Sequence, residues 1–172
     1  MSIMARGERE LHSKMTIATT VGDALAFEGI DFRILRKSPT AASVDGLRKA
    51  GVEPEGCAKA LLLKDAYGYL LTVTAATRVL DIERLRRELH RELVPAGEDD
   101  LDELFCDCEV GSVPPIGPWY RIPTVVDSSL RDQTNIFFDA GESSSLVQVT
   151  EEGFEKLLEG AEYFAFSTHA CS

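Results

Sequence analysis

The 172-residue sequence has no apolar run long enough to cross a bilayer. Residues 1–14 are polar and mixed in charge, so they lack the apolar centre of a signal peptide. These absences argue against a membrane partner and lead us to expect a cytoplasmic protein. The hydrophobic content of 44% suffices for a full core. We therefore expect one domain over residues 1–172, with 1–15 as a loosely ordered lead-in.

Cysteine is scarce and follows no pattern. The four cysteines lack the regular spacing of a disulfide framework, which fits a reducing compartment. Cys106 and Cys108 are separated by one residue, and no second pair complements them as in a zinc knuckle. No cluster of His, Asp and Glu has metal-ligand spacing either. The sequence therefore predicts no metal and no other cofactor.

Basic residues are scarce in the second half of the chain. The net charge of −11 argues against a general nucleic-acid binder, and we expect no DNA partner. Residues 1–91 hold 15 Lys and Arg against 12 Asp and Glu, whereas residues 92–172 hold 3 against 17. A polyanion could dock on the first half near Arg84, Arg86, Arg87 and Arg91, with salt-sensitive affinity. Alternatively, these arginines form only the solvated face of a helix.

Several catalytic motifs are missing. The sequence has no Gly-x-Ser-x-Gly elbow, Walker loop or dinucleotide-binding glycine pattern. Its three histidines are poor candidates for a general base, because His12 and His169 lie near the termini and His90 lies on an arginine-rich helix. An enzyme with this sequence would work by positioning and electrostatics.

Helical and strand patterns alternate along the chain. This alternation predicts an α+β fold with a mixed, curved, barrel-like sheet surrounded by helices. The run at 57–64 is apolar on both faces, so we expect it at the centre of the sheet. Thr20, Asp81 and Thr150 are expected to cap helices. The expected helices are 20–29, 43–50, 81–89, 99–105 and 150–158, and the expected strands are 31–36, 57–64, 69–74, 121–126, 136–139 and 145–149.

A lone lysine and a rigid loop suggest a binding site. Lys59 begins the apolar run that continues to Leu63, and a lysine entering a buried strand needs an anion or carbonyl dipoles beside it. The later loop 111–117, Gly-Ser-Val-Pro-Pro-Ile-Gly, can offer backbone amides and a stiff wall. Together they indicate a site for a small, polar, partly anionic group. Each feature alone is also typical of a strand end or a turn.

Three segments follow one another in an order that matches a known pattern. They are residues 56–63 (Gly-Cys-Ala-Lys-Ala-Leu-Leu-Leu), residues 110–117 with 121–127, and residues 137–141 (Phe-Phe-Asp-Ala-Gly). In this order they resemble the Lys-Thr-Leu-Leu strand, the Gly-x-x-x-Pro loop with its Leu-Pro-Thr-Ile-Ile-Asp segment, and the pocket-closing strand and turn of the YbaK/prolyl-tRNA synthetase-associated domain family. Members of this family hydrolyse mischarged aminoacyl-tRNAs in trans.

The resemblance implies a metal-independent deacylase for a small amino acid mischarged on tRNA, with the proline system as the expected source. Lys59 would hold the tRNA 3′ end, and the backbone at Gly111 and Ser112 would polarise the ester carbonyl. Water or a substrate hydroxyl would be the nucleophile. Mischarged tRNA is the expected partner, and prolyl-tRNA synthetase is a possible second one. The expected substrate-binding residues are Ala60, Pro115, Asp139, Gly141 and Ser143.

Two departures from the family pattern leave alternatives open. Ala60 stands where the family often has Thr or Asn, and residues 142–145 are Glu-Ser-Ser-Ser where several members place Lys or His. These differences argue against the alanine-clearing subgroup. They also allow a non-catalytic module that binds tRNA ends, a nucleotide or a synthetase. A small-molecule esterase or thioesterase is a third alternative.

Overall fold

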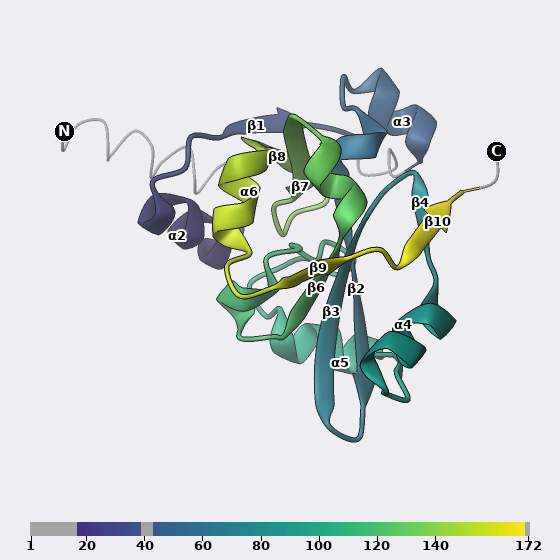
Figure 1. The fold of residues 1–172 in the computed structure, drawn as a ribbon. Helices are drawn as coiled ribbons and strands as arrows, with labels where there is room; N and C mark the ends of the chain where they lie inside the picture. Colours follow the sequence, from purple (N-terminus) through teal and green to yellow (C-terminus); the bar gives the residue numbers. More distant parts are fainter. Residues whose placement is uncertain (1–16, 39–42, 171–172) are drawn as a thin grey trace.

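The structure, a computed structural model, describes residues 17–38 and 43–170 (Figure 1). The expected lead-in at 1–15 lies outside the described residues. Among the helices described, none is long and apolar enough to cross a membrane.

The fold is built on one mixed sheet, which confirms the expected α+β class. Seven strands follow the order β1-β8-β7-β2-β3-β6-β9, and β5 pairs with β2 off this path. Pairing is parallel for β2–β7, β3–β6 and β6–β9, and antiparallel for the other neighbours. Barrel-like closure stays a prediction. The strands are β1 Arg33–Arg36, β2 Cys57–Asp65, β3 Gly68–Ala75, β5 Val94–Pro95, β6 Thr124–Asp127, β7 Asn135–Asp139, β8 Ser145–Thr150 and β9 Glu162–Phe164.

The strand β2 lies at the centre of this order, as its two apolar faces predict. It forms a long hairpin with β3, which extends away from the rest of the sheet in Figure 1. The Asp65 carboxylate closes the hairpin turn by accepting hydrogen bonds from the amides of Tyr67 and Gly68. Arg91 then binds both oxygens of Asp65 at 2.7 Å, which joins the turn to the segment after helix α4.

The helices surround the sheet, and most begin where the sequence predicts. Asp81 caps α4 by accepting from the Arg84 amide, and Thr150 caps α6 by accepting from the Gly153 amide. Both confirm the expected caps. The helices are α2 Thr19–Glu28, α3 Val44–Lys49, α4 Ile82–Leu89, α5 Glu98–Leu104 and α6 Glu151–Leu157.

Two expected boundaries were wrong. Helix α2 begins at Thr19 with Ala18 at the N-cap, because the Ala18 amide is fixed on the Ala140 carbonyl at 2.7 Å. The amide of Thr20 instead donates to the Asp107 carboxylate at 2.9 Å, so an acid from a distant loop caps this helix. The strand expected at 121–126 begins only at Thr124. A 3-10 helix occupies Gly117–Tyr120, and Arg121 ends it with a φ of 60°.

The sequence patterns did not predict three short strands of three residues each. Strands β4, Arg78–Leu80, and β10, Ser167–His169, form a separate antiparallel pair, and β9 adds an edge to the main sheet. Runs this short show no measurable alternation, so only pairing with distant partners reveals them.

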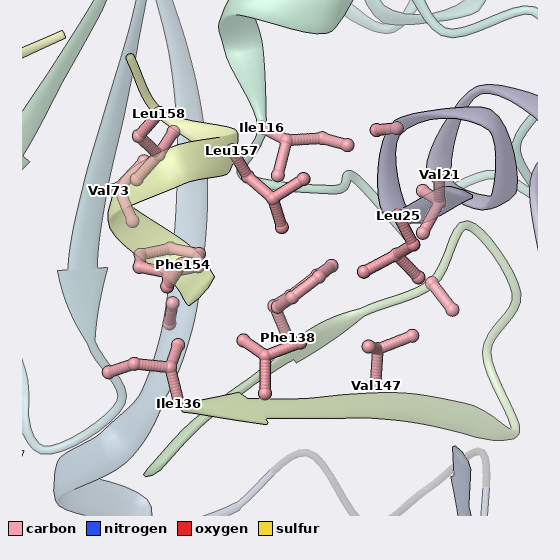
Figure 2. Packing of buried hydrophobic residues seen from close by; sticks show 14 of the residues in the cluster. Val21, Leu25, Val73, Ile116, Ile136, Phe138, Val147, Phe154, Leu157 and Leu158 are labelled. Carbon is pink, nitrogen blue, oxygen red and sulfur yellow. The ribbon is translucent and has the colours of Figure 1, made fainter. Parts of the chain in front are cut away.

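The main core lies between the sheet and helices α2 and α6 (Figure 2). Phe138 of β7 and Phe154 of α6 pack with ring centroids 5.7 Å apart, and both are fully buried. Ile116, from the loop that precedes β6, reaches the same cluster. The core therefore anchors the loop 111–117 as well as the sheet.

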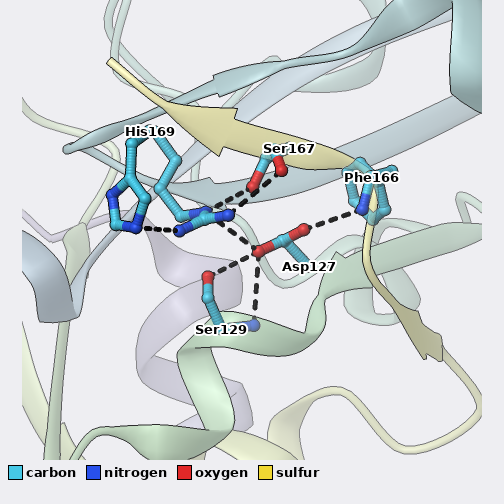
Figure 3. A network of polar contacts seen from close by, with 6 residues as sticks. Asp127, Ser129, Phe166, Ser167 and His169 are labelled. Carbon is cyan, nitrogen blue, oxygen red and sulfur yellow. Dashed lines mark hydrogen bonds and ion pairs between the residues drawn. The ribbon is translucent and has the colours of Figure 1, made fainter. Parts of the chain in front are cut away.

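A buried carboxylate joins β6 to the end of the chain (Figure 3). Asp127 is 1% exposed and accepts hydrogen bonds from the Phe166 amide at 2.9 Å and from both donors of Ser129. Arg78 lies 3.6 Å from Asp127 and also donates to Ser167. Burial alone would raise the pKa of Asp127, but the Ser129 and Phe166 hydrogen bonds outweigh it, so the pKa is lowered.

We expect Asp127→Ala to lower the free energy of unfolding by about 3 kcal/mol or more, because Arg78 and the Phe166 amide lose a buried partner. Urea unfolding followed by circular dichroism measures this. Asp132→Ala is the matched control, because Asp132 is exposed at the end of the next turn. Equal stability of the two variants would contradict a stabilising role for the network.

The same network predicts a dependence on pH. Because folding lowers the pKa of Asp127, its contribution is fully present above the usual aspartate value of about 3.9. It is lost as the pH falls below that value toward the folded pKa. The stability difference between the native chain and Asp127→Ala should therefore stay constant above about pH 5 and shrink as the pH falls from about 5 to about 2. A difference that stays constant over this range would contradict the prediction.

Candidate functional site

Lys59 and Asp139 lie side by side because β2 and β7 are parallel. The register pairs Cys57 with Phe137 and Ala58 with Phe138, so the next step along both strands brings Lys59 level with Asp139. The Lys59 Nζ lies 3.9 Å from the Asp139 Oδ2. The lysine side chain is 31% exposed and the aspartate 13%, so the ammonium group is the accessible end of the pair.

Burial governs the ionisation of the groups around this pair. Burial raises the pKa of Asp139, while Lys59 and Lys37 oppose the rise. Burial likewise raises the pKa of the Cys57 thiol to about 11, although Lys59 lowers it in part. Cys57 is therefore protonated at neutral pH and is a core thiol on the same face as Lys59, not a nucleophile.

Ala60 points to the opposite face of β2, since consecutive strand residues alternate. There it packs against an apolar cluster that includes Leu62, Leu71 and Phe105. Val113, from the middle of the loop 111–117, packs against the same cluster. The loop therefore covers the Ala60 face, whereas Lys59 meets Asp139 on the other. The sequence predicts a loop that faces Lys59 directly. In the structure, the described contacts connect the loop to Lys59 through residues 139–143.

The loop itself is anchored at one end and open at the other. Gly111 is exposed with a φ of 85°, a conformation that favours glycine. The next residue, Ser112, is buried, and its amide donates to the Glu109 carbonyl at 3.1 Å. Pro115 is buried. The amide of Ser112 is thus already engaged within its own turn.

Gly141 joins the two halves of the site. Its φ is 89°, and a Cβ on this residue would lie 2.6 Å from the Ala18 Cβ and 3.1 Å from the Cys108 Sγ. The Gly141 carbonyl accepts from the Glu109 amide at 2.8 Å. This close contact holds the turn after β7 against the segment that leads into the loop 111–117.

Charged residues hold both polar groups of the Ser143 peptide. The Ser143 amide donates to the Glu109 carboxylate at 3.0 Å, and the Ser143 carbonyl accepts from the Lys37 Nζ at 2.5 Å. The hydroxyls of Ser144 and Ser145 both donate to Glu142. Sequence reasoning missed Lys37 and Glu109, because neither belongs to a local motif and their contacts bridge distant parts of the chain.

Two arginines in and after the arginine-rich helix α4 already bind other groups of the protein, so fewer of them can bind a polyanion. Arg86 donates to the Leu93 carbonyl and binds Glu83, and Arg91 binds Asp65. Both are thereby committed to the fold. Within residues 17–38 and 43–170, no group of three or more His, Cys, Asp or Glu is placed to hold a metal ion.

The structure thus brings most of the expected site residues around one turn. Asp139 ends β7, and Gly141 and Ser143 lie in the turn that follows it, residues 140–144, which we call the serine turn. Lys59 is paired with Asp139, and Glu109 links the serine turn to the Gly111–Ser112 end of the loop. Ala60 contributes apolar support beneath the loop, and Pro115 is a buried residue of the loop itself. This arrangement defines a class of protein. It is an α+β domain in which a lysine of the central strand, a glycine-bounded loop and a serine turn lie close together.

The chain belongs to the aminoacyl-tRNA editing domain family, whose model matches residues 37–157. The matched range contains Lys59, the loop 111–117 and the serine turn.

Solved structures share the fold at low sequence identity. One is described as a candidate trans-editing enzyme for prolyl-tRNA synthetase, with 19% identity, a TM-score of 0.74, and coverage of 89% of this chain and 99% of that one. The protein designated APE2540 has 22% identity and a TM-score of 0.72, with coverage of 87% and 99%. A candidate signal transduction protein from Marinobacter aquaeolei VT8 has 19% identity and a TM-score of 0.72, and 89% of this chain matches 31% of that longer chain.

We expect Gly141→Ala to destabilise the protein by about 2 kcal/mol or more, since the new methyl group meets Ala18 and the backbone is strained. Thermal or urea unfolding measures the change. Gly160→Ala is the matched control, because Gly160 has a φ of 94° with nothing within 4 Å of the added Cβ. Both variants carry the backbone strain of a positive φ, so the difference between them measures the steric contact of the added methyl group. A Gly141→Ala variant no less stable than the control would contradict the close packing of this turn.

Proposed function

We propose that the protein is a trans-acting aminoacyl-tRNA deacylase that hydrolyses the ester of a small amino acid mischarged on tRNA. The proposed source of the error is the proline system, with prolyl-tRNA synthetase as a possible partner in the cytoplasm. The observation that carries the proposal is the Lys59–Asp139 pair beside the Ser143 turn, within a chain of the aminoacyl-tRNA editing domain family.

Lys59 is suited to hold the anionic end of tRNA. Its ammonium group is partly exposed, and at 3.9 Å it is only loosely paired with Asp139. A phosphate oxygen can therefore approach the free side of the ammonium group without breaking a tight hydrogen bond. Asp139 keeps the lysine oriented from the protein side. The proposed role of Lys59 is to bind and place the 3′ end.

The ester then needs polarisation more than a strong base, because an aminoacyl ester is already activated. Backbone amides at the start of the loop 111–117 are proposed to face its carbonyl oxygen. The open part of that loop is Gly111, while the Ser112 amide serves its own turn. We therefore place the polarising role on the backbone around Gly111. Water or a hydroxyl of the substrate completes the hydrolysis, and no step requires a metal.

A non-catalytic module that binds tRNA ends is the second candidate, and two observations favour it. Ala60 offers no polar group and packs in an apolar cluster, and the Ser112 amide is already bonded. Such a module keeps the Lys59 contact but lacks donors for the reacting carbonyl. It predicts saturable, salt-sensitive binding of uncharged tRNA without cleavage.

A panel of mischarged tRNAs tests the proposed activity, with the native chain compared with Lys59→Ala. We expect at least one small aminoacyl ester to be cleaved well above the buffer rate. Loss of Lys59 should lower kcat/KM by about 10- to 100-fold, as for a charged hydrogen bond of about 1.5–3 kcal/mol.

Lys64→Ala is the matched control, because Lys64 lies on the same strand but pairs with Asp100 at 2.8 Å. It should retain native activity. Absence of cleavage for every substrate would favour the binding module, and full activity of Lys59→Ala would refute the role of Lys59.

A further inference from the structure

Two side chains of opposite charge form hydrogen bonds with the main chain of one residue, Ser143. The Lys37 ammonium group binds its carbonyl and the Glu109 carboxylate binds its amide. Lys37 follows strand β1, and Glu109 lies in the turn before Gly111. We call this arrangement of Lys37, Ser143 and Glu109 the charged clamp.

The main chains of the two clamp residues reinforce it. The Lys37 amide donates to the Ser144 carbonyl at 2.9 Å, and the Glu109 amide donates to the Gly141 carbonyl at 2.8 Å. Four hydrogen bonds therefore converge on residues 141–144 from two segments that are distant in sequence. Charge-assisted hydrogen bonds are stronger than neutral ones, so these contacts favour a single position of the turn.

The clamp leaves one hydroxyl available. Ser144 and Ser145 donate their hydroxyls to Glu142. The hydroxyl of Ser143 has no hydrogen-bond partner in the described part of the chain, residues 17–38 and 43–170. Among the three consecutive serines, Ser143 is therefore the one whose side chain can meet an incoming polar group.

We propose that Lys37 and Glu109 are positioning residues that fix the Ser143 hydroxyl against the aminoacyl group and so set which amino acid is cleared. This inference rests on the proposed deacylase function. The group recognised is a polar atom of the aminoacyl moiety, its α-amino group or a small side-chain hydroxyl. Selection through a hydroxyl requires a fixed position, because a mobile serine would adapt to several substrates.

The test compares discrimination between aminoacyl groups, taken as the ratio of kcat/KM for the best and second-best substrates of the panel. We expect Lys37→Met and Glu109→Ala each to reduce this ratio by about tenfold, the usual effect of losing one charge-assisted hydrogen bond. Lys37→Arg and Glu109→Gln keep a donor and an acceptor, so they should recover part of it. In a Ser143→Ala background, Lys37→Met should cause no further loss, because it acts through Ser143.

Lys49→Met and Glu159→Ala are the matched controls, since both residues are exposed, Lys49 at the end of α3 and Glu159 just after α6. They should keep the native ratio. Unchanged discrimination in Lys37→Met and Glu109→Ala, with the native chain active, would overturn the inference and leave the proposed function standing. If the native chain cleaves no substrate, the proposed deacylase function is overturned, and with it the role of the charged clamp in substrate selection.

Hydrogen exchange of the Ser143 amide tests the clamp without any activity. We expect this amide to exchange at least about tenfold faster in Glu109→Ala than in Glu159→Ala, because it loses its carboxylate acceptor. Equal exchange in the two variants would overturn the clamp itself.

Discussion

The parallel pairing of β2 with β7 is the constraint on which the rest of the site depends. It brings residues 57–58 into register with 137–138, and so brings a lysine and an aspartate from distant parts of the chain to one level. Neighbours on both sides, β3 and β8, hold these strands in place by antiparallel pairing. A shift of one residue would turn Lys59 into the apolar cluster beneath the loop and expose Ala60. The register is therefore a condition for the proposed site as well as for the core.

The turn after β7 transmits this register to the loop 111–117. Gly141 allows a close approach to Ala18 and Cys108 that any side chain would obstruct. Asp107, next to Cys108, accepts from the Thr20 amide at the start of α2. One short segment, 107–109, thus fixes both the start of a helix and the serine turn. The buried residues of the same loop, such as Ile116, then connect it to the main core.

The sequence was sufficient for the central hairpin and for the helices capped by Asp81 and Thr150, because each has a local pattern. Asp65 and Gly68 signal a turn, and Asp81 and Thr150 signal helix starts. Lys37 and Glu109 have no such signal: their partner Ser143 lies 106 and 34 residues away, respectively. The error at Thr20 has the same origin, since a contact with Ala140 decides where α2 begins. Long-range contacts thus account for what local patterns could not predict.

The two departures from the family pattern gain a common physical explanation from the geometry. Ala60 faces an apolar cluster with Val113, so a methyl group there supports the loop instead of meeting a polar substrate. The polar groups of the proposed site lie on the other face of the sheet, at Lys59 of β2 and Asp139 of β7, and the turn after β7 leads from them to Ser143. A site arranged in this way would recognise the tRNA end by charge and the amino acid by the serine turn. Loss of a polar side chain at position 60 is compatible with editing if the turn is held rigidly, and the contacts of Lys37 and Glu109 are those that would hold it.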